Sequence, residues 1–472
     1  MQSQLAKNTA IYALGDIIPK LLNLITIPIL TTHLSTEDFG IVNYVNSIEM
    51  FLSILTLMGL KTYFLVYYYR AGDEEKQKRL LGSLTILVLF FNLLLCTILM
   101  VIGPIFFNKI GQNINFYPFI FLGIANNFLS TFSTLPSALY RVRENPLPLT
   151  VINALKGLLI LLGTIIIIRH TPNAEVVLRV KILVSAVFAV YFGIIAIRNS
   201  IFKIDFSLFK QALLFSLPLV PGDIAYYFST MSDRILIERY LSASVLGIYS
   251  LAATLAGLLN IISYGAYKAF EPFFFKTYGQ ITFVHNFEKV RNILLYIMLV
   301  FGLCLSIFSK EVVVLFAKPE YIDASNYVAP LVLGVMISSI ATMYGTVLTA
   351  QSKTKLNGVI SLITAVVSVV FNMIFLPIIG IWAATIANVL IFSLSLFLSR
   401  TISNIRIETL RPMLGIVFFI LVSYLANYHI GFNNVIQSVL LKVLIVSLFS
   451  TVLANIFKVK PRNIFLMFKK NQ

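Results

Sequence analysis

Fourteen apolar segments, each long enough to cross a bilayer as a helix, dominate the chain and constrain its fold. A helix of roughly 20 apolar residues spans the hydrocarbon core of a membrane. Only 12% of the 472 residues are charged, whereas soluble domains carry about 25%. Because backbone polar groups find no water in lipid, we expect an all-α polytopic membrane protein. The predicted spans are 8–33, 40–65, 81–107, 117–140, 148–168, 176–197, 211–233, 244–270, 291–309, 326–350, 358–378, 381–399, 413–429 and 435–457.

A gapless internal repeat divides these spans into two sets, because residues 15–72 recur 207 positions later. The interval contains six predicted spans, so both copies enter the membrane from the same side. Such halves are related by a pseudo-two-fold axis along the membrane normal. We expect six-helix bundles at 1–204 and 205–402, followed at 403–472 by two extra helices and a basic tail. Shared pairs include Asp16 and Asp223, Ser35 and Ser242, Gly40 and Gly247, and Lys61 and Lys268.

Basic residues are distributed unequally between the two sets of connections. The loops on one side of the predicted topology, together with both termini, hold 23 lysines and arginines, and the opposite loops hold 6. Cytoplasmic loops carry such an excess, so we expect both termini in the cytoplasm. The net charge of +17 then reflects contact with anionic lipid rather than with nucleic acid.

Several ionisable residues lie within the apolar spans. A charge at the centre of a spanning helix costs at least ~2.5–3.5 kcal/mol, so such residues usually face a cavity or a partner. Asp16 and Lys20 are four residues apart on one helix face, where they either neutralise each other or place Lys20 in a polar cavity. Lys156 has no partner on its own helix, and we expect it to face inward. The other candidates are Glu49, Lys181, Asp223 and Lys442, of which the two lysines lie nearer the outer interface.

Prolines interrupt the equivalent first helix of each half. Proline removes one backbone hydrogen bond and bends a helix, and membrane helices tolerate it where neighbours or water satisfy the freed carbonyl. These bends are either static kinks or hinges for alternating access. The prolines are Pro19, Pro28, Pro218 and Pro221.

The second half also offers oxygen ligands for a coupling ion. Asp223, Asn372, Thr385 and Asn388 supply carboxylate, amide and hydroxyl oxygens, which suit Na⁺ or a shuttled proton if the side chains converge. Tyr226 and Tyr227 lie beside Asp223, where they either stack on sugar rings or pack against a neighbouring helix.

Enzyme and metal signatures are not found in the sequence. It has no Gly-rich phosphate loop with its lysine, no HExxH and no nucleophile elbow. The four histidines are scattered without metal-ligand spacing. We expect no enzyme activity, no cofactor and no metal, with Na⁺ or H⁺ as the candidate coupling ion.

Two local motifs resemble a known family. The run Ser232-Asp233-Arg234-Ile235-Leu236-Ile237 with Leu246-Gly247-Ile248-Tyr249-Ser250, and the N-terminal Leu34-Ser35-Thr36-Glu37-Asp38-Phe39-Gly40-Ile41, resemble signatures of bacterial polysaccharide-repeat flippases. These O-antigen and capsule flippases (Wzx type) belong to the multidrug/oligosaccharidyl-lipid/polysaccharide exporter superfamily. The resemblance extends over the chain length, the two halves and the two trailing helices.

The resemblance implies a flippase in the bacterial inner membrane that moves an undecaprenyl-pyrophosphate-linked oligosaccharide, used for lipopolysaccharide or capsule, from the inner to the outer leaflet. It implies a cationic cavity, in which Lys20 and Lys156 would hold the pyrophosphate. Asp223 and Asn372 match, in residue type and helix, a cation site of the related lipid II flippases. Expected partners are membrane lipid, a polysaccharide polymerase and glycosyltransferases. The alternative is a multidrug or organic-cation antiporter of the same superfamily.

Overall fold

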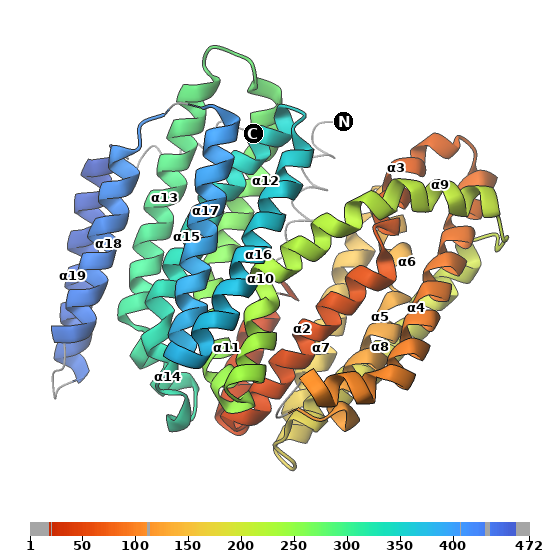
Figure 1. The fold of residues 1–472 in the computed structure, drawn as a ribbon, viewed down its shortest axis with the longest axis horizontal. Helices are drawn as coiled ribbons and strands as arrows, with labels where there is room; N and C mark the ends of the chain where they lie inside the picture. Colours follow the sequence, from red (N-terminus) through yellow and green to blue (C-terminus); the bar gives the residue numbers. More distant parts are fainter. Residues whose placement is uncertain (1–17, 20, 111–113, 406, 430–434, 459–472) are drawn as a thin grey trace. The chain divides into compact units, whose positions relative to one another are not determined.

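The computed structural model describes residues 18–19, 21–110, 114–405, 407–429 and 435–458. All regular secondary structure within these residues is helical (Figure 1), which confirms the predicted all-α class. Among the described residues, eleven helices are long and apolar enough to cross a membrane, and Leu21–His33 and Leu410–Ala426 are shorter apolar helices. The predicted span 117–140 is divided among a π-helical turn, Phe116–Ile120, and two short helices, α5 (Phe121–Thr131) and α6 (Thr134–Val142). The number of fourteen crossings therefore stays a prediction.

The chain forms two compact units, Met1–Gly247 and Ile248–Gln472. The predicted bundle boundary at 204/205 follows the sequence repeat, and it stays a prediction. The first described helix of the first unit is Leu21–His33, and the other elements of the unit come after it in the chain. They are α2 (Thr36–Leu57), α3 (Leu60–Tyr67), α4 (Glu74–Ile110), α5, α6, α7 (Pro146–Ile168), α8 (Ala174–Asn199), α9 (Phe206–Ser216), η3 (Leu217–Leu219), α10 (Val220–Tyr240) and the start of α11 (Ala243–Gly257).

The two copies of the repeat meet within the first unit at their equivalent glycines. A Cβ added at Gly40 would overlap the carbonyl oxygen of Ala243, and one added at Gly247 would overlap that of Thr36. Thr36 and Ala243 are themselves equivalent positions in the repeat. Small residues let membrane helices approach through their backbones, and a reciprocal contact of this kind has local two-fold symmetry. The start of α2 and the start of α11 therefore cross as a symmetric pair.

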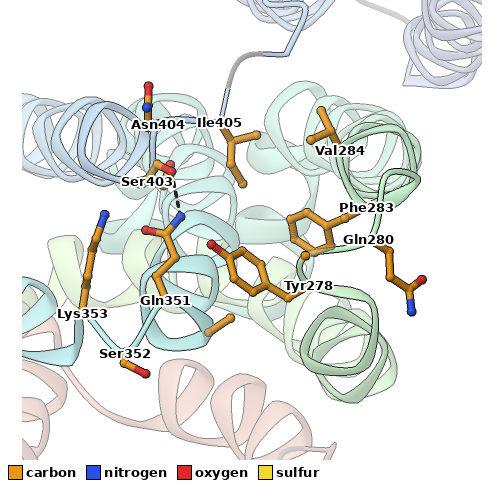
Figure 2. Close-up of a pocket in the computed structure, with 12 residues that line it drawn as sticks. Tyr278, Gln280, Phe283, Val284, Gln351, Ser352, Lys353, Ser403, Asn404 and Ile405 are labelled. Atoms are coloured by element: carbon orange, nitrogen blue, oxygen red, sulfur yellow. Dashed lines mark hydrogen bonds between the residues drawn. The ribbon is translucent and has the colours of Figure 1, made fainter.

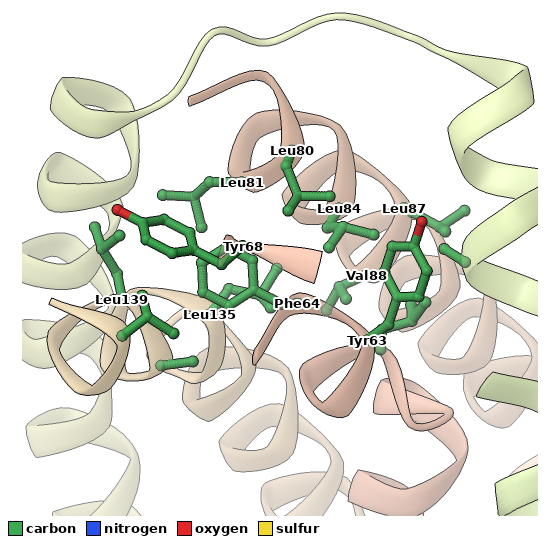
Figure 3. Close-up of a cluster of buried hydrophobic side chains, with 14 residues drawn as sticks. Tyr63, Phe64, Tyr68, Leu80, Leu81, Leu84, Leu87, Val88, Leu135 and Leu139 are labelled. Atoms are coloured by element: carbon green, nitrogen blue, oxygen red, sulfur yellow. The ribbon is translucent and has the colours of Figure 1, made fainter. Parts of the chain in front are cut away.

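Three helices of the first unit are interrupted near one another. Between α2 and α3, Met58 and Gly59 have positive φ angles of 44° and 75°. The 3-10 turn η3 separates α9 from α10, and α5 ends just before α6. A Cβ at Gly59 would lie 3.2 Å from the carbonyl oxygen of Ser216, so two interruptions adjoin. Beyond them, side chains of α3, α4, α6 and α9 pack into one apolar cluster around Phe64 and Leu84 (Figure 3).

The second unit is built around two buried helices. Its elements are the rest of α11, α12 (Leu259–Thr277), α13 (Phe283–Ile307), α14 (Ser309–Phe316), η4 (Pro319–Tyr321), α15 (Ala324–Ala350), α16 (Thr354–Ile379), α17 (Ile381–Ser403), α18 (Leu410–His429) and α19 (Val435–Phe457). Within its most apolar stretch, α15 is 72% buried and α13 is 61% buried. Both α18 and α19 pack on α13, as Figure 1 shows.

Polar contacts also attach the last two helices. The Tyr296 hydroxyl of α13 lies 2.9 Å from the Ser450 hydroxyl of α19, and the rings of Phe418 and Phe449 stack at 5.0 Å. Lys442 is buried and pairs with Glu311 of α14. The extra helices are therefore fixed to the second unit by specific contacts.

Within each unit, the basic loops gather at one end. In the first unit, the Tyr69 hydroxyl donates to the carbonyl of Val142 at 2.8 Å, and Arg143 donates to Asn199 at 2.8 Å. In the second unit, the Gln351 amide donates to the carbonyl of Ser403 at 2.8 Å. The loops that we predict on the cytoplasmic side thus share an end within each unit.

Candidate functional site

A cluster of polar side chains lies among the apolar helices of the first unit. The Glu49 carboxylate on α2 accepts hydrogen bonds from Lys181 Nζ on α8 at 2.7 Å and from Asn126 Nδ2 on α5 at 3.0 Å. Lys181 Nζ also donates to Asn46 Oδ1 on α2 at 2.6 Å. Lys156 on α7 interacts electrostatically with both Lys181 and Glu49. We call these five residues the polar cluster.

Local sequence explains why these helices bring the cluster together. Asn46 and Glu49 are three residues apart, so they share one face of α2. On α5, Gly123 allows a close approach to that face, because a Cβ there would lie 2.7 Å from Val45 Cγ1. On α7, Gly157 gives similar room to the first helix, since a Cβ there would lie 2.9 Å from Leu22 Cδ1.

The cluster has excess positive charge and unused acceptor oxygens. The Lys181 and Glu49 side chains are 25% and 14% exposed, and Asn46 is exposed. Glu49 Oε1 and Asn126 Oδ1 are buried and have no hydrogen-bond partner among the described residues. The cluster contains one carboxylate and two ammonium groups, of which Lys181 contacts the carboxylate directly, so the described part of the cluster is net positive. Such an arrangement is suited to holding an anion, because charges in an apolar interior need opposite charges.

The residues predicted to bind substrate differ in whether the structure describes them and in how far they are buried. Asp16 and Lys20 lie outside the described residues. Lys156 is partly buried on α7 and interacts electrostatically with the cluster, and its role in substrate binding stays a prediction. On α10, Tyr226 is 58% exposed, whereas Tyr227 is fully buried. The Tyr227 hydroxyl donates to the carbonyl of Ser47 at 3.0 Å, which favours the packing interpretation for that ring.

The four predicted hinge prolines lie in two places, the first helix and the junction between α9 and α10. Pro19 is in helical conformation, and Pro28 lies within the helix Leu21–His33, which is uninterrupted around it. Pro218 lies in η3, and Pro221 lies in the first turn of α10. The α9–α10 prolines therefore coincide with a break in helical geometry, and their role as hinges stays a prediction.

The predicted coupling-ion residues do not all belong to one unit. Asp223 is exposed in the first turn of α10 in the first unit. In the second unit, Asn372 and Thr385 are fully buried. Asn372 Nδ2 donates to the carbonyl of Ser368 at 3.0 Å, and Asn388 packs against Gly334.

Two amide oxygens of this set are unused. Asn372 Oδ1 and Asn388 Oδ1 are buried without a hydrogen-bond partner in the described part of the chain. Both residues lie eight positions from Gly380, which joins α16 to α17, so they lie at one depth of a helical hairpin. No group of three or more histidine, cysteine, aspartate or glutamate side chains that could hold a metal occurs among the described residues.

The second unit also has an open pocket of about 700 Å³ at its basic end. Residues at the ends of several helices line it, among them Tyr278, Phe283, Gln351 and Lys353. Figure 2 shows the Gln351 amide directed toward Ser403, so this side chain joins two of the loops.

Sequence reasoning did not assign a site role to Asn46, Glu49, Asn126 or Lys181. Glu49 and Lys181 were visible as ionisable residues in apolar segments, but they are 132 residues apart and only the fold reveals their pairing. Asparagine is less costly than a charge in such a segment, and for that reason Asn46 and Asn126 gave no signal.

The sequence of this chain is similar to those of known protein families. The sequence profile of the family described as "Polysaccharide biosynthesis protein" matches residues 5–278, more than half of the chain. The chain belongs to this family. A second profile, described as MatE, matches residues 218–374. The chain is also 25% identical over 285 residues to "Lsg locus putative protein 1" of Haemophilus influenzae, covering 58% of this chain and 67% of that protein.

Solved structures of two kinds of transporter share the fold. "Lipid II flippase MurJ, inward closed conformation" matches with a TM-score of 0.77 at 13% identity, over 96% of this chain and 99% of that one. An inward-facing multidrug resistance MATE family transporter matches with a TM-score of 0.65 at 14% identity, over 83% and 98%. This member of the polysaccharide biosynthesis protein family is therefore a multi-pass membrane protein with the fold of a lipid flippase and of MATE transporters.

Proposed function

We propose that this protein moves an undecaprenyl-pyrophosphate-linked oligosaccharide from the inner to the outer leaflet of the bacterial inner membrane. The observation that carries the proposal is the polar cluster, in which Lys156 and Lys181 outnumber the Glu49 carboxylate inside apolar helices. A pyrophosphate cannot enter lipid without replacing its hydration. Family membership supports a substrate from polysaccharide synthesis, such as a precursor of lipopolysaccharide O-antigen or capsule.

In the proposed cycle, alternating access opens the substrate site first to one side of the membrane and then to the other. Lys20 and Lys156 hold the pyrophosphate, Asp16 balances Lys20, and the exposed ring of Tyr226 stacks on a sugar. The polyprenyl chain stays in lipid. Pro19, Pro28, Pro218 and Pro221 act as hinges, and the helical break at η3 supports this role for the last two.

The coupling ion is Na⁺ or H⁺ in this proposal. Hard cations prefer oxygen ligands, and Asn372 Oδ1 and Asn388 Oδ1 are buried acceptors without partners among the described residues. Thr385 supplies a hydroxyl on the same helix as Asn388, and Asp223, which belongs to the first unit, is the acidic residue among the predicted ion-coupling residues. The protein contributes the ligands, and the ion gradient would supply the driving force.

The proposed orientation places both termini in the cytoplasm, since the basic loops gather at one end of each unit. In that orientation, the headgroup enters from the side where glycosyltransferases assemble it and leaves toward a polysaccharide polymerase. Membrane lipid is the constant partner of the apolar surface.

Loss of the gene in its source bacterium tests the proposal. We expect lipid-linked oligosaccharide to accumulate in the inner leaflet and surface polysaccharide to disappear, and the wild-type gene should restore both. A Lys20→Ala/Lys156→Ala double variant should fail to restore them, whereas full restoration would remove the anchor assignment. Normal surface polysaccharide in the deletion strain would refute the function.

The match of residues 218–374 to MatE keeps a multidrug antiporter as the second candidate. Such a carrier exports organic cations and would need a net acidic interior, and the polar cluster has the opposite charge. Efflux of a fluorescent cation such as ethidium, at a rate that depends on this gene, would favour the second candidate.

A further inference from the structure

Glu49 and Lys181 form an ion pair within the polar cluster. Lys181 Nζ lies 2.7 Å from Glu49 Oε2, although the two residues belong to different helices. An unpaired ammonium inside apolar helices is costly. The carboxylate therefore takes the position, relative to Lys181, that an anionic ligand would need.

We propose that Glu49 is an internal counter-anion that occupies Lys181 in the empty carrier and yields it to a phosphate of the substrate. This inference rests on the proposed function. It makes Lys181 a phosphate-binding residue beside Lys156, and it makes Glu49 a positioning residue that tunes affinity and release.

The hydrogen bonds of the cluster allow this exchange. Asn126 Nδ2 donates to Glu49 Oε2 at 3.0 Å, so the carboxylate keeps one donor after Lys181 has moved. Glu49 sits on α2 and Lys181 on α8, and the lysine has a flexible four-carbon chain that can swing toward a ligand. Lys181 is 25% exposed and its other partner, Asn46, is exposed, so a ligand can reach the ammonium.

The exchange has two consequences for transport. Substrate binding competes with an interaction that is already present, so affinity is lower than two free lysines would give. On release, Glu49 recaptures Lys181, and the carrier returns empty without an unpaired buried charge. A carrier benefits from this balance, because binding that is too tight slows turnover.

Glu49→Gln separates this role from a purely structural one. Glutamine keeps the size and the hydrogen bond from Asn126, but it removes the charge that competes for Lys181. We expect the full-length variant in lipid nanodiscs to bind farnesyl pyrophosphate about tenfold more tightly than the wild type, with slower flipping of a fluorescent polyprenyl-pyrophosphate sugar. Farnesol binding should not change, and Glu49→Asp should behave like the wild type. Lys181→Met should bind the pyrophosphate more weakly.

A measurement on the wild-type protein tests the proposal without a variant. Dicyclohexylcarbodiimide labels carboxyl groups in apolar surroundings, and peptide mass spectrometry can quantify the label on Glu49. We expect saturating farnesyl pyrophosphate to raise this labelling as Lys181 leaves the carboxylate, and farnesol to leave it unchanged.

The outcomes distinguish the two proposals. If the wild type binds farnesyl pyrophosphate, but Glu49→Gln binds it no more tightly and Glu49 labelling does not rise, the counter-anion role is wrong and the proposed function stands. If the wild type shows no preference for farnesyl pyrophosphate over farnesol, the proposed function fails, and this inference fails with it.

Discussion

The two copies of the repeat share one backbone contact, at the point where they cross, and differ in chemistry beyond it. Gly40 and Gly247 occupy equivalent positions and meet in a reciprocal crossing of α2 and α11. Nine residues further along α2, Glu49 belongs to the polar cluster, whereas its equivalent in the second copy is Ala256, which is buried and apolar. A crossing at which backbones touch depends on small residues in both copies, while a binding site can be built in one copy alone.

The polar residues inside the two units also differ in chemistry. The first unit holds charged groups among its apolar helices, namely Glu49, Lys156 and Lys181. At the helical hairpin of α16 and α17, the second unit has neutral amides instead, with unused oxygens on Asn372 and Asn388. The charged polar cluster suits an anionic headgroup, and the neutral oxygens of the α16–α17 hairpin suit a cation, so the duplication allows two tasks within one fold.

The largest expected effect is on the symmetric crossing. Gly40→Ala and Gly247→Ala each place a methyl group on a backbone carbonyl of the opposite helix, and overpacking of this kind costs about 3 kcal/mol at the upper end of its range. Because the contact is reciprocal, the two variants should lower the unfolding temperature in detergent by similar amounts. A harmless substitution at either glycine would show that the crossing is not symmetric.

Gly193→Ala is the matched control for the crossing. Gly193 lies in α8, and nothing lies within 4 Å of a Cβ added there. Alanine favours a helix by about 1 kcal/mol over glycine, so this variant should be as stable as the wild type or slightly more stable.

The next effect concerns the charged pair of the first unit. Removing one partner of a buried ion pair costs ~3–5 kcal/mol, and the partial exposure of this pair reduces the expectation for Lys181→Met to about 2–3 kcal/mol. Glu49→Leu in the Lys181→Met background should recover most of that loss, because it removes the uncompensated charge. Thermal unfolding of the single and double variants in detergent measures the coupling, and additive losses would contradict it.

Removing one partner of the ion pair between Lys442 and Glu311 in the second unit should have a smaller effect. Lys442 is 6% exposed and its partner Glu311 is 31% exposed, so the carboxylate left by Lys442→Met can still reach a polar environment. We expect a loss of about 1–2 kcal/mol with normal flipping in proteoliposomes. If a stable Lys442→Met variant could not flip the substrate, the Lys442–Glu311 pair would be needed for transport, and our comparison of the two units would be wrong.

The smallest effect belongs to the hydroxyl of Tyr227. Its bond to the carbonyl of Ser47 at 3.0 Å is worth about 1 kcal/mol, so Tyr227→Phe should lower the unfolding temperature slightly and leave transport intact. Tyr226→Phe, at the exposed neighbour, should change neither. A loss of transport in Tyr227→Phe without a loss of stability would return that ring to the substrate site.

The sequence predicted the parts of this fold that depend on local pattern. Hydropathy located the helices, and the repeat identified Gly40 and Gly247 as equivalent residues. It did not reveal that these glycines meet, because a contact across 207 residues depends on how the helices pack. The interruption at Met58 and Gly59 was also missed, since the segment stays apolar through the break.

The candidate site was predicted only in part, for a similar reason. Lys156 was expected to face inward because it is alone on its helix, and in the structure it interacts electrostatically with Glu49 and Lys181. The pairing of Glu49 with Lys181 was missed because they belong to different helices, and a lysine near a span's end is equally compatible with contact to water. Tyr227 has the same local sequence context as Tyr226, so only the fold could distinguish a buried ring from an exposed one.

The central claim is that the charged cluster of the first unit carries a pyrophosphate headgroup across the membrane. The most direct test is transfer of a fluorescent undecaprenyl-pyrophosphate disaccharide between the leaflets of proteoliposomes, for the wild type and a Lys156→Met/Lys181→Met variant shown to be folded. We predict transfer by the wild type and less than a tenth of that rate for the variant. Equal rates for both proteins would contradict the account.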